Sequence, residues 1–171
     1  MMRIFLIGYM GSGKTTIGRL VAERMNMNFT DMDELIERKA GKSVSEIFSD
    51  LGEDKFRELE RNCLLEVAGY EQTIISTGGG APCFFDNMEI MNSLGDTIYI
   101  CLTPKQLASR LRTTNLNNRP VLASYQGNDL EKFIASTLQK REIFYNQAKI
   151  KISGTDSQIA DKIIKHLQGE F

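Results

Sequence analysis

The chain has 171 residues, of which 42% are hydrophobic and 25% are charged, and its formal net charge is −1 at pH 7. This composition is typical of a globular protein with one domain and a sizeable core. The near-neutral charge argues against a large basic surface for nucleic acid or for an anionic membrane. No apolar run approaches the roughly 18 residues of a membrane-spanning helix, so no membrane partner is expected.

Cysteine usage and the start of the chain predict a reducing, cytoplasmic location. Cys63, Cys83 and Cys101 provide neither an even disulfide framework nor a C-x-x-C pair. The first predicted strand begins too early for a signal peptide to precede it. His166 is the single histidine, so neither a histidine-based triad nor a histidine-rich metal site is expected.

The apolar patterns predict strands that alternate with helices along the chain. The predicted strands cover residues 3–8, 28–31, 73–77, 96–102 and 148–152. The predicted helices cover 14–25, 32–40, 43–50, 53–69, 84–94, 104–112, 128–147 and 156–168. This alternation is typical of βαβ units, which predicts one α/β domain over residues 1–171, with a parallel sheet and helices on both faces. Ligands of such sheets bind beyond the carboxyl ends of the strands.

The first strand leads into a glycine-rich loop, Gly8-Tyr9-Met10-Gly11-Ser12-Gly13-Lys14-Thr15. The loop matches G-x-x-x-x-G-K-[ST] and stands between a predicted strand and a predicted helix, as phosphate-binding loops do. Its glycines allow backbone N–H groups to point at an anion, and the helix adds the positive end of its dipole. We expect Lys14 to reach the β- and γ-phosphates of a nucleotide and Thr15 to place its hydroxyl on Mg²⁺.

Two carboxylates, Asp31 and Asp33, follow the second predicted strand. Asp31 is expected to support Mg²⁺ through water, and Asp33 to accept a proton or hydrogen bonds from a substrate hydroxyl. The alternative interpretation is that one of them caps the helix at 32–40. The other internal strands do not end in acidic residues, so the carboxylate of a metal site is expected from this segment.

Arg57 lies beside apolar residues in the predicted helix 53–69, with Glu60 one turn later. The pair predicts either a surface ion pair worth about 0.3 kcal/mol or a guanidinium held ready to bind a carboxylate.

The triplet Gly78-Gly79-Gly80 follows the third predicted strand. Three glycines favour a close approach of backbone N–H groups to a ligand, and a tight exit from the strand is the alternative.

Two segments are interpreted as insertions in a minimal sheet. The first, 33–60, packs helical pieces between the second and third strands. The second, 112–124, is polar and is typical of a lid. Arg119, followed by Pro120, is expected to close over the γ-phosphate, and Arg112 to lie over the adenine; either can instead be a solvated charge. Arg141 lies on the inward face of the helix 128–147 and needs an anionic partner, either a structural carboxylate or a bound acid.

Taken in order, these motifs resemble the shikimate kinase family, within the nucleoside-monophosphate-kinase-like group of P-loop folds. The resemblance runs over nearly the whole chain. The matching residues are Gly8-x-x-Gly11-x-Gly13-Lys14-Thr15-Thr16-x-Gly18, Asp31-x-Asp33, Phe48 with Phe56-Arg57-x-x-Glu60, Gly78-Gly79-Gly80, Asn118-Arg119-Pro120-Val121-Leu122 and Arg141-x-x-x-Tyr145. The tail after Ser153 matches poorly.

The resemblance implies a three-layer α/β/α P-loop fold with a five-stranded parallel sheet, a substrate-binding segment at 33–60 and a lid at 112–124. It implies transfer of the γ-phosphoryl group of ATP, with Mg²⁺, to the 3-hydroxyl of shikimate. The implied substrate-binding residues are Asp33, Arg57, Gly79 and Arg141. The implied ATP-binding residues are Gly11, Ser12, Gly13, Lys14, Thr15, Thr16, Arg112 and Arg119. The implied catalytic residues are Lys14, Asp33 and Arg119, and the implied metal-binding residues are Thr15 and Asp31.

Three other functions compete with this interpretation. Another small-molecule kinase of the same fold would act on gluconate or on a nucleoside monophosphate. A GTPase-like regulatory module would need N-K-x-D and D-x-x-G motifs, which the chain lacks. An inactive P-loop scaffold is disfavoured because Lys14, Thr15, Asp31, Asp33 and Arg119 are all present. Nothing in the sequence demands more than a monomer.

Overall fold

The computed structural model describes residues 2–113, 125 and 128–170. Its strands are β1 (Arg3–Ile7), β2 (Asn28–Asp31), β3 (Thr73–Ser76), β4 (Asp96–Ile100) and β5 (Ile150–Ile152). They form one sheet in the order β2-β3-β1-β4-β5, and each neighbouring pair is parallel. The predicted five-stranded parallel sheet is therefore confirmed, with strand ends that differ from the prediction by up to two residues.

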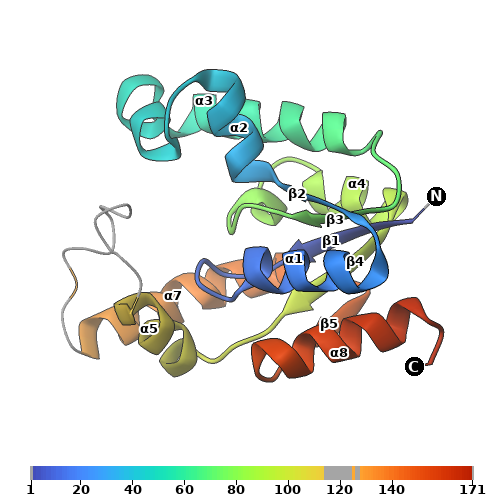
Figure 1. Cartoon of the computed structure of the whole chain (residues 1–171). Coiled ribbons are helices and arrows are strands. Elements are labelled where there is room, and N and C mark those ends of the chain that lie inside the picture. Colours follow the sequence, from blue (N-terminus) through green and yellow to red (C-terminus); the bar gives the residue numbers. More distant parts are fainter. Residues whose placement is uncertain (1, 114–124, 126–127, 171) are drawn as a thin grey trace.

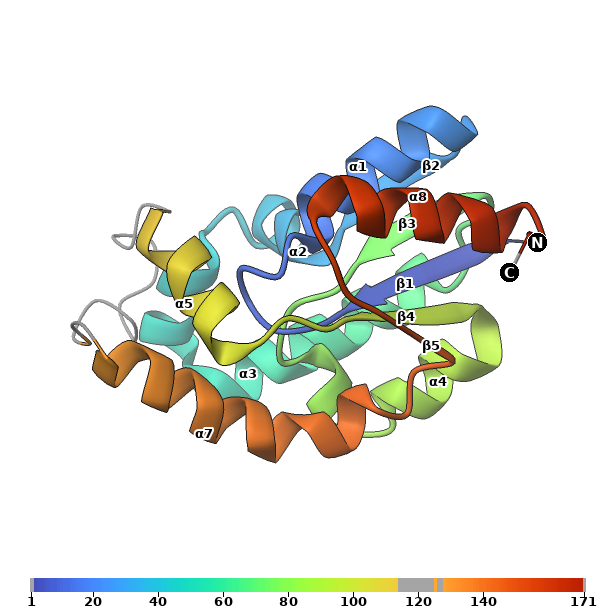
Figure 2. The same ribbon diagram turned by 90° about the horizontal axis from the view of Figure 1, so that it is seen from below.

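Helices connect the strands and cover both faces of the sheet (Figures 1 and 2). They are α1 (Lys14–Met25), α2 (Met32–Ala40), α3 (Val44–Val67), α4 (Asn87–Leu94), α5 (Pro104–Thr113), α7 (Asn128–Tyr145) and α8 (Asp156–Leu167), with a short 3₁₀ helix, η1 (Ala81–Cys83), before α4. Helices α1 and α8 pack on one face, and α3, α4, α5 and α7 pack on the other. The result is the expected three-layer α/β/α arrangement.

Strand β1 runs through the centre of the sheet and is buried on both faces. Its side chains alternate, so that Ile4 and Leu6 face the layer of α1 and α8 while Phe5 and Ile7 face the opposite layer. An apolar run of this kind is typical of a parallel strand that is covered on both sides. Because β1 is central, the loop that follows it emerges at the middle of the sheet edge.

Helix α3 unites two predicted helices, 43–50 and 53–69. Gly52 interrupts it with φ of 81° and ψ of 170°, so the predicted break is present although the two pieces form one element. Ser43 caps the helix through a reciprocal capping box with Glu46. Helix α2 and most of α3 form the predicted segment 33–60, which stands above the β2 edge of the sheet in Figure 1.

The predicted helix 84–94 begins only at Asn87, so the prediction is wrong for its first residues. Phe84 is extended, with φ of −120°, and Phe85 has φ of +51°. The extended backbone of Phe84 accompanies a contact of its ring with Arg57, whose guanidinium carbon lies 4.0 Å from the ring centroid. Residues 84–86 thus form a connection that closes over α3.

The predicted lid falls mostly outside the described residues. Residues 112 and 113 belong to the last turn of α5, and 114–124 are not described. The lid and Arg119 therefore stay predictions. None of the helices in the described ranges is both long and apolar enough to cross a membrane.

Candidate active site

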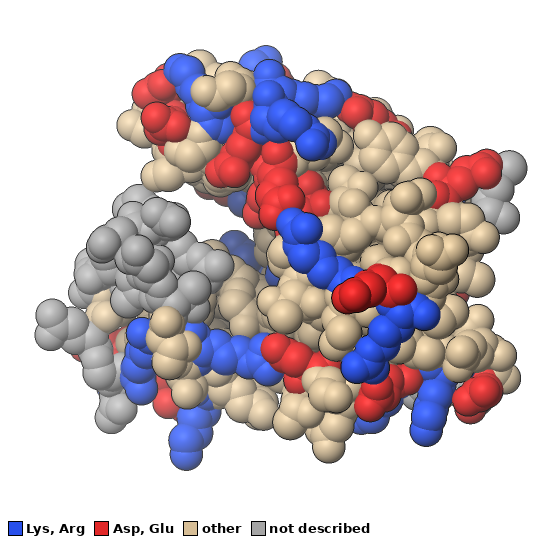
Figure 3. All heavy atoms as spheres, in the orientation of Figure 1, with Lys and Arg blue, Asp and Glu red and all other residues tan. Residues whose placement is uncertain are grey.

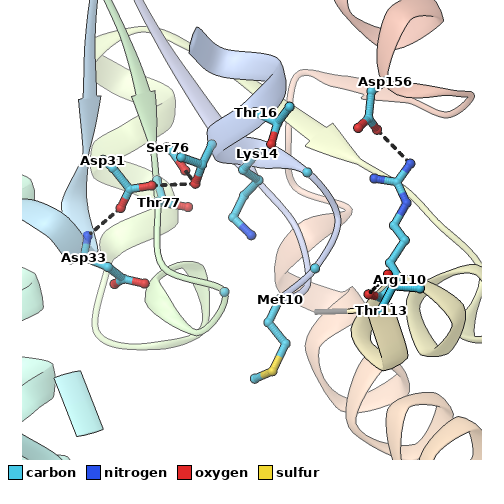
Figure 4. A pocket seen from close by; sticks show the side chains of 14 residues that line it. Met10, Lys14, Thr16, Asp31, Asp33, Ser76, Thr77, Arg110, Thr113 and Asp156 are labelled. Carbon is cyan, nitrogen blue, oxygen red and sulfur yellow. Dashed lines mark hydrogen bonds and ion pairs between the residues drawn. The ribbon is translucent and has the colours of Figure 1, made fainter. Parts of the chain in front are cut away.

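A cavity of about 390 Å³ lies at the carboxyl ends of β1, β2 and β3. Figure 3 shows the molecule hollowed between the α2–α3 part and the part below it, and Figure 4 shows the side chains that line the cavity. The lining residues are Met10, Gly11, Gly13, Lys14, Thr15, Thr16, Asp31, Asp33, Ser76, Thr77, Gly79, Arg110, Thr113 and Asp156. Three of the lining segments lie at the ends of β1, β2 and β3 or just after them, and residues of α5 and the first residue of α8 complete the lining.

The glycine-rich loop wraps around the start of α1. Gly8, Gly11 and Gly13 all have positive φ, of 146°, 78° and 97°, which residues with a Cβ adopt at a cost. Gly13 is the N-cap of α1 and provides no side-chain cap. The first N–H groups of the helix are therefore left for an anion, which the helix dipole also favours.

Lys14 reaches over this loop from the first turn of α1. Its ammonium donates hydrogen bonds to the carbonyls of Gly8 (2.8 Å) and Tyr9 (3.0 Å), and its side chain is almost buried. A bound phosphate would compete for the same protons. Gly11, Gly13, Thr15 and Thr16 line the cavity with it, while Ser12 is buried within the loop.

Thr15 and Asp31 meet at the opposite side of the loop. The Thr15 hydroxyl donates to Asp31 Oδ2 at 2.6 Å, and Ser76 Oγ lies 3.4 Å from it. Asp31 Oδ1 accepts from the backbone N–H groups of Asp33 (3.0 Å) and Glu34 (3.3 Å), and so caps α2. The capping alternative therefore holds for Asp31. Its other oxygen faces Thr15, and the expected role of Asp31 in supporting a metal stays a prediction.

These donors fit a magnesium ion. Hydroxyl and carboxylate oxygens are the ligands that Mg²⁺ prefers, and Mg²⁺ in kinases takes its other ligands from phosphate and water. Among the described residues, no group of three or more histidine, cysteine or acidic side chains is suited to a metal. The side chains in the described ranges therefore do not supply a complete set of metal ligands. Thr15 and Asp31 instead suit a metal ion that takes its remaining ligands from a bound nucleotide and water.

Asp33 points into the cavity as a poorly solvated carboxylate (Figure 4). Its Oδ1 is buried, with no hydrogen-bond partner among the described residues. Burial, and next the charge of Asp31, raise the pKa of Asp33 to about 6, while the nearby Lys14 ammonium opposes the shift. A carboxylate whose pKa lies close to the working pH suits a general base.

Arg57 is not the surface residue that one interpretation of the sequence allowed. It is 8% exposed, and its guanidinium contacts Glu60 at 2.7 Å and Glu53 at 3.0 Å. Glu60 is itself 1% exposed, and its Oε1 has no partner in the part of the chain that the structure describes. Burial raises the pKa of Glu60, although Arg57 opposes this. The pair is therefore a buried ionic group beside the cavity.

The glycine triplet passes between these charged groups with no room for side chains. A Cβ on Gly78 would lie 2.6 Å from Glu60 Oε1, and one on Gly80 would lie 2.7 Å from both terminal nitrogens of Arg57. A Cβ on Gly79 would lie 3.1 Å from the backbone nitrogen of Met10. Close packing against the phosphate loop and the ionic pair thus explains why the segment is made of glycine.

Arg141 reaches toward the same region from α7. Its guanidinium carbon lies 5.4 Å from the centroid of the Tyr9 ring, a cation–π contact that leaves its hydrogen bonds to other partners. Its Nη1 is buried and has no hydrogen-bond partner within the described ranges. This nitrogen is thus available to an anionic partner, and whether that partner is a bound acid stays a prediction.

The structure adds cavity residues that the sequence analysis did not select. Arg110, rather than Arg112, lines the cavity; it donates to the Ser12 carbonyl (3.3 Å) and contacts Asp156 at 2.7 Å (Figure 4). Arg112 is exposed near the end of α5, and its proposed place near adenine stays a prediction. The local sequence offers two arginines two positions apart, and only the helix orientation distinguishes them.

The class of the protein follows from the fold and the loop. A parallel sheet with a phosphate-binding loop after its central strand, between helical layers, defines a P-loop α/β protein that binds nucleotide.

Comparison with known proteins gives the family. Residues 10–170 match the shikimate kinase family. A shikimate kinase of Parabacteroides distasonis is 48% identical over 165 residues, which cover 94% of this chain and 95% of the relative. The chain belongs to the shikimate kinase family.

Solved structures agree with this assignment. The crystal structure of shikimate kinase from Bacteroides thetaiotaomicron superposes with a TM-score of 0.90 at 45% identity, covering 98% of this chain and 97% of the other. Shikimate kinase from Acinetobacter baumannii, in complex with shikimate, superposes with a TM-score of 0.88 at 32% identity, covering 99% and 94%. The predicted P-loop fold is therefore confirmed.

Proposed function

We propose that this chain transfers the γ-phosphoryl group of ATP to the 3-hydroxyl of shikimate, giving shikimate 3-phosphate on the route to chorismate and the aromatic amino acids. The observation that carries the proposal is that one cavity joins the phosphate-binding loop to Asp33, with the buried Arg57 against its glycine wall. Shikimate carries a carboxylate, which suits Arg57 and Arg141, and hydroxyl groups, which suit Asp33 and the Gly79 backbone.

The residues have distinct roles in this reaction. Lys14 and the loop N–H groups bind the β- and γ-phosphates, and Arg119 closes over the γ-phosphate. Asp33 orients the attacking hydroxyl and takes its proton, because its pKa near 6 leaves it mostly ionised at neutral pH. Arg57 and Arg141 hold the acid so that its hydroxyl faces the phosphorus. Phosphoryl transfer needs alignment and charge stabilisation more than covalent help.

Thr15 and Asp31 would hold the metal, which we propose to be Mg²⁺. When bound, the ion offsets negative charge on the phosphates. The hydroxyl of Thr15 and the carboxylate of Asp31 already lie 2.6 Å apart, so little rearrangement is needed to share one ion. We further propose that the protein works as a cytoplasmic monomer.

A coupled assay of ADP release tests the function. With ATP and Mg²⁺, we expect release to rise steeply when shikimate is added and to stay near background with gluconate or a nucleoside monophosphate. A higher rate with gluconate or a nucleoside monophosphate would show that this acceptor, and not shikimate, is the substrate. Release that no acceptor stimulates would instead favour a regulatory module or an inactive scaffold.

A further inference from the structure

The glycine triplet at residues 78–80 has no side chains with which to hold its own position. Its carbonyl groups show what fixes it. The Gly78 carbonyl accepts from the N–H of Ala81 (3.1 Å), and the Gly80 carbonyl accepts from the N–H of Cys83 (2.8 Å). Both bonds are local and belong to the turn into η1. The middle carbonyl, that of Gly79, is held differently.

The Gly79 carbonyl accepts a hydrogen bond of 2.5 Å from the phenol of Tyr145, 66 residues away in the sequence. Tyr145 is the last residue of α7 and is fully buried. Its ring packs against that of Tyr99, with the centroids 5.1 Å apart. The phenol therefore has a fixed position, and the bond connects the glycine wall of the cavity to a different layer of the fold.

The same bond fixes more than one atom of the triplet. A trans peptide is planar, and its C=O and N–H point in opposite directions. When Tyr145 holds the carbonyl of Gly79, it also sets the direction of the N–H of Gly80, which belongs to the same plane. Gly79 lines the cavity and packs against Met10 of the phosphate loop. The orientation of this peptide therefore matters to any ligand that contacts the wall.

We propose that Tyr145 is a positioning residue for the acceptor substrate. Its hydroxyl holds the Gly79–Gly80 peptide in the orientation that a polyhydroxylated acid requires, and it couples that peptide to α7, the helix that carries Arg141. The inference rests on the proposed function, because the acceptor is taken to be shikimate. Tyr145 does not itself contact the reacting atoms in this scheme.

The phenol is suited to act as a permanent donor. Burial raises the pKa of Tyr145, while Arg141 opposes the shift. The phenol also interacts through a hydrogen bond with the Arg141 side chain, so that Tyr145 orients Arg141 as well as the Gly79 carbonyl. The other groups around the phenol are Cys83 from η1, Tyr9 from the phosphate loop and Tyr99 from β4. Since the hydroxyl stays protonated at working pH, its contribution to substrate binding is expected to be independent of pH in the native protein.

The variant Tyr145→Phe removes the hydroxyl and keeps the ring. We expect the KM for shikimate to rise by about 5-fold or more, within the range of about 5- to 150-fold for an orphaned buried acceptor. The KM for ATP should change less than about twofold, and kcat should fall less than the shikimate KM rises. Tyr99→Phe is the matched control, because it makes the same deletion on the neighbouring ring, whose hydroxyl has no hydrogen-bond partner among the described residues. It should leave both KM values unchanged.

An unchanged shikimate KM in Tyr145→Phe would overturn the inference, as would an equal rise in Tyr99→Phe. If Tyr145→Phe does not fold, 4-fluorophenylalanine at position 145 keeps the ring and most of the volume of the hydroxyl but donates no hydrogen bond. Its shikimate KM should rise as it does for Tyr145→Phe, and a native shikimate KM in this variant would refute the proposal. The native protein serves as the reference throughout: without shikimate-dependent ADP release, the proposed function itself fails.

Discussion

The environment of Asp33 has opposite effects on its suitability as a base and on the stability of the fold. Its carboxylate is half-buried next to Asp31, and its Oδ1 is buried with no hydrogen-bond partner among the described residues. An isolated carboxylate in such surroundings resists ionisation. The same resistance makes it a base of suitable strength near neutral pH. Function and folding therefore favour different protonation states of this group.

Activity should depend on pH through Asp33. Because the proposed base must be ionised, we expect kcat/KM for shikimate to fall as the pH drops through about 6, the pKa of Asp33. The measurement is a pH profile of kcat/KM at saturating ATP.

Asp33→Asn should cut turnover by orders of magnitude while ATP still binds. Near-normal turnover in that variant would remove Asp33 from the mechanism.

Stability should depend on the same group with the opposite sign. The folded-state pKa of about 6 lies above the ordinary value of 3.8, so the folded protein binds more protons between these values. The stabilising contribution is complete below about pH 4 and is lost as pH rises through about 6. Asp33→Asn should therefore stabilise the fold at pH 8 by on the order of 1–3 kcal/mol, measured by urea denaturation. A destabilised variant would contradict this account.

Arg57 and Arg61 offer a matched comparison on one helix. Both are arginines of α3, but Arg57 is buried beside the cavity whereas Arg61 pairs with Asp86 nearer the surface. We expect Arg57→Ala to weaken shikimate binding by tenfold or more in calorimetry, because the variant lacks the guanidinium that we propose binds the carboxylate. ATP binding should change far less. Arg61→Ala should leave both affinities close to native; equal losses in the two variants would count against the clamp.

At the scale of elements, the turn after β3 forms a wall of the cavity from backbone alone. The triplet at 78–80 occupies the space between the phosphate loop, Glu60 and Arg57, with separations that exclude a Cβ. Helix α3 supplies the ionic pair, and the extended Phe84 covers it from the other side. The wall of the cavity is thus made from backbone, held by neighbours on three elements.

Gly80→Ala tests this packing directly. Gly80 has φ of −91°, which alanine adopts without strain, so the added Cβ acts only through its predicted clash at 2.7 Å with the Arg57 guanidinium. Displacing that guanidinium should raise the shikimate KM by about tenfold or more, with a smaller effect on ATP. Gly69→Ala is the control, since its Cβ would meet only the Glu66 carbonyl at 3.4 Å. Normal kinetics in Gly80→Ala would show that Arg57 can move at no cost.

At the scale of the whole molecule, ligands that bind the folded state should stabilise all three layers together. At a concentration of about 100 times its Kd, shikimate should add about 2.7 kcal/mol, a rise of roughly 5–10 °C in the unfolding temperature of a domain of this size. Differential scanning fluorimetry with shikimate, and with gluconate as control, measures this. A shift with gluconate alone would reassign the acceptor.

Much of the architecture was predictable because its signals are local. Apolar runs of strand length alternate with helical patterns, and this alternation implies a parallel sheet. The phosphate loop is contiguous, so glycine, Lys14 and Thr15 carry their chemistry in their spacing. The boundary that went wrong, at residues 84–86, is a place where tertiary contacts override a helical pattern, whereas the predicted break at Gly52 is present.

What the tertiary structure alone decided is which distant residues share one cavity and in what electrostatic state. The sequence could not tell whether Arg57 and Glu60 lie on the surface, since their spacing is the same in either case; burial settled it. It could not choose between the uses of Asp31, nor show that Tyr145 holds Gly79 across 66 residues. Contacts of this kind arise from the packing of layers, and packing depends on the whole chain at once rather than on any local pattern.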